Sequence, residues 1–140
     1  MPLEGQPPNR GAIEVKGTGD DMFTTAQSEQ VARYAERYGR VLVTNLRDFV
    51  LVEWNTAKGE AQPLESCQLA INEASFWAKA AQPRKFADEA GEGLAEFLQR
   101  VMLHSAAIAE PKDVAWWLAS YARTARLRLE HRDLPALGAR

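Results

Sequence analysis

One cysteine and no long apolar run set the first limits on this 140-residue chain. Cys67 has no second cysteine for an internal disulfide, and no cysteine or histidine lies at metal-site spacing from it, so we expect a small core residue. No apolar stretch is long enough to cross a bilayer, and the N-terminus lacks the basic and then apolar pattern of a signal peptide. We therefore expect a cytoplasmic protein with no membrane partner.

An excess of positive charge is also lacking. The chain has 17 Lys and Arg against 19 Asp and Glu, a net charge of −2. Because phosphate neutralisation supplies most non-specific affinity for nucleic acids, this balance excludes a histone-like binder and leaves room only for a local DNA-binding patch. With 46% hydrophobic and 26% charged residues, the composition is that of an ordinary globular protein, and the length suits a single core.

The pattern of residues 1–66 is typical of a mixed α/β fold. Thr24 is the expected N-cap of a helix, with Gln27 in the capping-box position and Gly39 as the terminator. Two runs rich in β-branched residues, separated by a turn-sized linker, predict an antiparallel hairpin. The expected elements are strands at 11–16, 41–44 and 49–54, a helix at 25–38 and an extended segment near 63–69.

Residues 67–132 carry helical patterns and no strand signal. We expect a short segment at 71–81, a long amphipathic helix from Arg84 to Val101, and a last helix that begins at Pro111. Residues 133–140 are expected to form a flexible tail. The predicted fold class is α/β: a mixed sheet with a packed helix, followed by an all-α connector that packs on it.

Two opposite charges stand two residues apart in the first predicted strand, Glu14 and Lys16. That spacing directs both to one face, while Ile13 and Val15 point to the other. The Glu14 carboxylate and the Val15 carbonyl are oxygen ligands suited to Mg²⁺, and the Lys16 ammonium could orient water or stabilise charge on a phosphate. A Glu and a Lys at this spacing are, however, more often a solvated surface pair.

Gln30 and Tyr34 are four residues apart, so they share one side of the predicted helix. If that helix crosses the first strand, both side chains reach toward Glu14 and Lys16 and support them through hydrogen bonds. The alternative is a core tyrosine with an exposed glutamine beside it.

This arrangement resembles the PD-(D/E)XK nuclease superfamily, in which Glu-x-Lys on a core strand precedes a helix that carries Gln-x-x-x-Tyr in one branch. The stretches beginning at Arg10, Ser28, Val41, Arg47 and Glu110 look similar to the N-terminal region of large bacterial restriction-modification enzymes. The resemblance covers nearly the whole chain. It implies a restriction-endonuclease-like fold, double-stranded DNA as substrate, Mg²⁺ as cofactor, and a helical connector that precedes an adenine-specific DNA methyltransferase.

The chain departs from that family in two respects. The family places an acidic metal ligand upstream of Glu14, where Glu4 is the sole acid, so we expect the true ligand to lie in sequence missing before Met1. No Asn-Pro-Pro-Tyr-type motif or glycine-rich cofactor loop follows, so we expect the methyltransferase domain to be missing too. Asp20 and Asp21 are interpreted as solvated turn formers.

Two functional hypotheses follow from these residues. The first is a magnesium-dependent DNA endonuclease module, expected to be incomplete, with catalytic Glu14 and Lys16 and with Arg123 and Arg126 as weak DNA contacts. The second is a non-catalytic DNA-positioning or protein-interaction module derived from the same fold. A structural α/β domain with no role in nucleic-acid chemistry is a third, weaker alternative.

Overall fold

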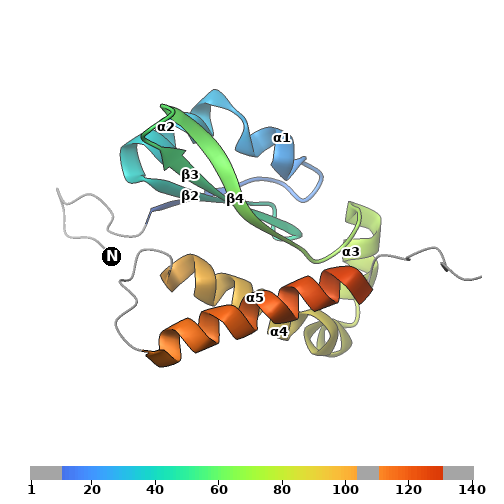
Figure 1. Ribbon diagram of the computed structural model, residues 1–140. Helices are drawn as coiled ribbons and strands as arrows, with labels where there is room; N and C mark the ends of the chain where they lie inside the picture. The colour runs from blue at the N-terminus through green and yellow to red at the C-terminus, as the bar shows by residue number, and fades with distance from the viewer. Residues whose placement is uncertain (1–10, 104–110, 131–140) are drawn as a thin grey trace, which may run out of the picture. The chain divides into compact units, whose positions relative to one another are not determined.

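The computed structural model describes residues 11–103 and 111–130 (Figure 1). The chain divides into two compact units, Met1–Met102 and Leu103–Arg140. The elements of the first unit are β1 (Ala12–Val15), α1 (Met22–Ala26), α2 (Glu29–Tyr38), β2 (Arg40–Thr44), β3 (Asp48–Asn55), β4 (Glu60–Gln68), α3 (Glu73–Ala80) and α4 (Pro83–Leu103). The second unit contains α5 (Pro111–Glu130). Within the described ranges, no helix is both long and apolar enough to span a membrane.

The first unit is built on a four-stranded mixed sheet in the order β1-β2-β3-β4. β1 runs parallel to β2, as a strand–helix–strand connection allows, and the other two pairings are antiparallel. The mixed α/β class and the β2–β3 hairpin were therefore predicted correctly from the sequence. The predicted extended segment is a full strand, β4, and a register shift opposite Leu51 and Val52 accommodates it on β3.

Helices cover both faces of this sheet (Figure 1). The alternation of the strands sends Val41, Val43, Val50 and Val52 to one face, where they pack against α1 and α2. Leu42 and Phe49 point to the opposite face and pack against Phe97 of α4. The sheet thus has a core on each side.

The predicted single helix over 25–38 was wrong, because the structure has two helices there. Asp21 caps α1 by accepting from the backbone N–H groups of Phe23 and Thr24, so Thr24 lies inside a helix and does not cap one. Ser28 then starts α2 by accepting from the N–H of Val31. The other end was predicted correctly, since Gly39 terminates α2 with a φ of 80°.

Candidate functional site

β1 places Glu14 on the face that α2 covers. Glu14 pairs in register with Val43, and the Val43 side chain belongs to the core beneath α1 and α2. The Glu14 side chain is only 16% exposed. Ile13 and Val15 point to the opposite face, where they are 67% and 57% exposed. The alternation expected from the sequence is therefore present, and it partly buries the charged face of β1.

The four residues predicted from the sequence come together around the Glu14 carboxylate. Lys16, which directly follows β1, places Nζ 2.7 Å from Glu14 Oε1. From α2, Gln30 Nε2 lies 3.3 Å from the same oxygen and also 3.3 Å from Tyr34 Oη. Because Gln30 can donate two hydrogen bonds, it connects the carboxylate to the phenol.

Electrostatics fix the charge state of Lys16. Its hydrogen bond to Glu14, together with the negative charges of Glu14 and Asp20, raises the pKa of the Lys16 ammonium above its ordinary value of 10.5. Lys16 is therefore a cation at neutral pH. It can attract or orient an anionic group, and it cannot act as a general base there.

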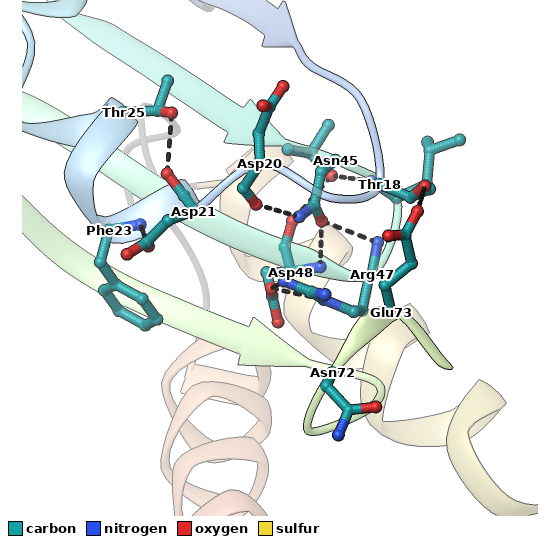
Figure 2. Close-up of polar contacts among 12 residues, drawn as sticks. Thr18, Asp20, Asp21, Phe23, Thr25, Asn45, Arg47, Asp48, Asn72 and Glu73 are labelled. Carbon is teal, nitrogen blue, oxygen red and sulfur yellow. Dashed lines mark hydrogen bonds and ion pairs between the residues drawn. The ribbon is translucent and has the colours of Figure 1, made fainter. Parts of the chain in front are cut away.

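The loop that follows Lys16 is held by two contacts of Asp20. Asp20 Oδ2 accepts a hydrogen bond of 3.0 Å from the N–H of Gly17, and this closes the turn. The Asp20 carbonyl accepts 2.9 Å from Asn45 Nδ2, which is buried at the end of β2 (Figure 2). Asp20 is thus more than the solvated turn former expected from the sequence, because its backbone joins the β1–α1 loop to the β2–β3 turn.

The β2–β3 turn is itself held together by side chains. Asn45 Oδ1 accepts from the backbone N–H groups of Arg47 and Asp48, at 3.0 and 2.7 Å (Figure 2). Thr44 Oγ1 donates to the Asp48 carbonyl and accepts from the N–H of Leu46. Leu46 has a φ of 69°, the left-handed conformation that a non-glycine residue rarely adopts. From the sequence this segment was interpreted only as a linker, although an Asn directly after a strand pattern is a recognisable Asx-turn signal.

A third contact connects the same loop to α3. Thr18 Oγ1 donates a hydrogen bond of 2.6 Å to Glu73 Oε1 (Figure 2). This bond, and next to it the influence of the Trp77 side chain, lowers the pKa of the Glu73 carboxyl below its ordinary value of 4.5. Glu73 therefore joins the loop after Lys16 to α3.

A buried ion pair on the opposite face of the sheet was not predicted from the sequence. Arg100 of α4 places Nε 2.6 Å from Glu65 Oε1, and the arginine is only 1% exposed. Glu65 lies in β4, 35 positions earlier. No local spacing could reveal such a pair, because it exists only once α4 packs on the sheet.

The metal ligands and DNA contacts expected from the sequence remain predictions, and the structure gives the positions of some of these residues. Glu14 and Val15 are adjacent residues of β1, and Val15 pairs with Thr44 of β2. The Glu14 carboxylate and the Val15 carbonyl therefore come from one strand. Within the described residues, no group of three or more His, Cys, Asp or Glu side chains is arranged to hold a metal. Glu4, expected only as a substitute acid, lies outside the described residues. Arg123 and Arg126 are exposed on α5, which belongs to the other unit.

Comparison of the chain with protein-family models, with curated proteins and with solved structures gave no match.

Proposed function

We propose that this chain carries the Glu-x-Lys half of a magnesium-dependent DNA endonuclease site, as part of a restriction-modification system. The observation that supports the proposal is the convergence on one carboxylate: Lys16 and Gln30 both contact Glu14 Oε1, from the end of β1 and from α2. A surface ion pair would not require a helix to present an amide to it. An active site does require its carboxylate to be held in one orientation.

The donors of the site suit a hard cation. Glu14 offers a carboxylate and Val15 a backbone carbonyl, and Mg²⁺ typically takes one or two carboxylates and keeps several waters. When bound, Mg²⁺ would neutralise phosphate charge and lower the pKa of a water. The donor set therefore fits the metal in chemistry, and a further acid from outside the described residues would complete it.

The chain's own residues have distinct roles in this proposal. Hydrolysis forms a bond from a water oxygen to phosphorus and breaks the bond from phosphorus to one sugar oxygen; the water loses a proton and the sugar oxygen gains one. Lys16, held as an ammonium, stabilises the negative charge that grows on the phosphate oxygens. Gln30 fixes the rotamer of Glu14, and Tyr34 fixes Gln30 in turn.

The same contacts support a second candidate function. Lys16 already balances the charge of Glu14 at 2.7 Å, so the site is electrostatically satisfied by protein groups alone. A non-catalytic module that positions DNA or binds another protein could keep these contacts for stability. Metal binding separates the two candidates, because only the nuclease needs it.

The test is cleavage of a supercoiled plasmid with Mg²⁺ or Mn²⁺, beside titration calorimetry with each metal. Glu14→Gln and Lys16→Met should each reduce nicking by about 10²-fold or more, since each removes a charged group that acts on the transition state. Glu53→Gln is the matched control, because it removes the carboxylate of another ion pair of the same length. Glu53 of β3 lies 2.7 Å from the NH2 group of Arg40 of β2.

The outcomes are distinct. Metal-dependent nicking that persists in Glu14→Gln would refute the site assignment. Absence of both metal binding and nicking, with DNA binding retained, would favour the non-catalytic module. Loss of nicking in the Glu53→Gln control would show that general destabilisation causes the effect.

A further inference from the structure

Lys16 has one ion-pair partner and a second carboxylate close by. Its ammonium lies 2.7 Å from Glu14 Oε1, and its side chain is still 34% exposed, so the pair is open to solvent on one side. Glu14 Oε1 also accepts from Gln30. Among the described residues, Asp20 carries the other carboxylate whose negative charge acts on the Lys16 ammonium. The lysine therefore has an alternative partner that the site assignment leaves without a role.

The turn after β1 holds Asp20 within reach of Lys16. The N–H of Asp20 donates to the Gly17 carbonyl at 3.1 Å, and Asp20 Oδ2 accepts from the N–H of Gly17 at 3.0 Å. The Gly17 nitrogen is about 2.4 Å from the Lys16 Cα, because only the Lys16 carbonyl carbon separates them. The sum of these distances puts Asp20 Oδ2 within about 5.5 Å of that Cα, and an extended lysine side chain spans about 6 Å. The ammonium can therefore reach the Asp20 carboxylate without any change in the backbone.

Asp20 is also fixed in place, and its carboxylate has bonding capacity left. Asn45 Nδ2 holds the Asp20 carbonyl at 2.9 Å, and the Asp20 side chain leaves the loop on the side away from Asn45 (Figure 2). Within the described part of the chain, the carboxylate accepts only the bond from Gly17, whereas a carboxylate can accept about four. An ammonium can therefore bind Asp20 while the turn stays closed.

Occupation of Glu14 by a metal would force the lysine to move. In the proposed function the Glu14 carboxylate holds Mg²⁺, and an ammonium and a divalent cation on one carboxylate repel each other at a distance of a few ångströms. Without another anion, the displaced ammonium would turn into solvent, away from the phosphate that it has to stabilise. Asp20 offers that anion at the same end of β1, so the cation stays close to Glu14.

We propose that Asp20 is a positioning residue for Lys16: the ammonium moves from Glu14 to the Asp20 carboxylate when a divalent cation occupies Glu14. The inference rests on the proposed function for that cation. Asp20 touches neither the metal nor DNA in this role. The move takes a competing positive charge away from Glu14, so Asp20 should favour metal binding although it is not a ligand.

The first test needs no metal. Glu14→Met keeps the length of the side chain and removes its charge and its acceptors, so Lys16 loses its ion pair. A crystal structure of this variant of the full chain, grown with EDTA, should show Lys16 Nζ within about 4 Å of an Asp20 carboxylate oxygen, the limit for an ion pair. A Lys16 side chain that points into solvent, without contact to Asp20, would overturn the proposal.

The second test is titration calorimetry of the full chain with Mg²⁺ and with Mn²⁺. Asp20→Asn should weaken metal binding by about two- to fivefold, which corresponds to the loss of one exposed ion pair. The matched control is Asp21→Asn, which removes a charge from the next residue, while the asparagine can still accept the N–H bonds that cap α1. Because Asp20 acts through Lys16, its effect should shrink to that of the control in a Lys16→Met background.

The results separate this inference from the proposed function. Equal weakening by Asp20→Asn with and without Lys16 would mean that Asp20 binds the metal, and equal weakening by both asparagine variants would reduce the effect to net charge; either result overturns the inference. If the wild type binds no metal, the proposed function fails, and the Glu14→Met structure alone decides whether Asp20 takes Lys16. Thermal unfolding identifies any variant that fails to fold. If that variant is Glu14→Met, the metal titration decides, because its variants are changed only at exposed or partly exposed positions.

Discussion

Asn45 provides the sharpest test of how the loop after Lys16 is held. Its side chain is fully buried and makes three hydrogen bonds: one donated to the Asp20 carbonyl and two accepted from backbone N–H groups. Asn45→Ala removes all three bonds and leaves three backbone groups without a partner. At about 1 kcal/mol for each net hydrogen bond, the free energy of unfolding should fall by about 3 kcal/mol.

Truncation of a neighbour in the same turn should not lower the stability of the protein. Leu46 is strained at φ 69° and its side chain is 57% exposed, so it loses little burial on truncation. Leu46→Gly relieves the left-handed strain, which is about 1 kcal/mol for an L-residue, although part of that gain is offset by the greater freedom of glycine in the unfolded chain. We expect stability unchanged or raised by up to about 1 kcal/mol.

Urea unfolding followed by tryptophan fluorescence measures both variants, provided that the m-value stays constant. A loss below about 1 kcal/mol in Asn45→Ala would refute the view that this side chain holds the two loops together. Equal destabilisation by Leu46→Gly would show that the turn tolerates no change at all, and the loss in Asn45→Ala could then not be assigned to its hydrogen bonds.

Three further predictions concern other parts of the first unit. Gly11→Ala should lower the free energy of unfolding by about 1–3 kcal/mol, because Gly11 has a φ of 109° and a Cβ there would lie 2.7 Å from the Arg40 carbonyl oxygen. Gly91→Ala, in open space on α4, should raise it by about 0.5–1 kcal/mol. Urea unfolding compares the two variants. Glu65→Ala should cost about 3 kcal/mol or more by the same measurement, because it removes a carboxylate from a buried arginine. Hydrogen bonds from Thr24 and Phe23 hold the pKa of Asp21 below its ordinary value of 3.8. The contribution of Asp21 to stability is therefore complete above pH 3.8 and is lost as the pH falls through the lowered pKa. Asp21→Asn should make stability fall less steeply in acid, and urea unfolding from about pH 7 to 3 measures this.

Much of the fold could be predicted where local chemistry decides it. Gly39 ends α2 because the chain needs a positive φ there, and Pro111 begins α5 because its missing N–H has no helical partner to lose. The hairpin of β2 and β3 followed from two β-branched runs and a short turn. In each case, the signal lay within a few residues.

The failures lie where several local signals compete or where tertiary contacts decide. Thr24 and Ser28 are both good caps, and Asp21 outcompeted Thr24 by bonding its N–H. The β4 sequence contains Pro63 and two glutamates and few β-branched residues, so its strand character comes from pairing with β3 and not from propensity. For the site, the spacing placed Glu14 and Lys16 on one face, but contact with Gln30 depends on where α2 crosses β1, which no periodicity gives.

An ion pair on this sheet is not evidence of function by itself. Arg40 and Glu53 also lie 2.7 Å apart, and because they come from paired strands their contact fastens β2 to β3. Glu14 and Lys16 belong to one segment, so their ion pair joins no two strands, yet Glu14 is the more buried of the two carboxylates, at 16% exposed against 29%. Burying a carboxylate costs free energy. At Glu14 this cost is not offset by an ion pair between two strands, as it is at Glu53. The amide of Gln30 orients this carboxylate further. A binding or catalytic carboxylate must be held in one orientation, and Glu14 is held so by an ion pair that joins no two strands. This contrast is why Glu14, and not Glu53, is the residue to test.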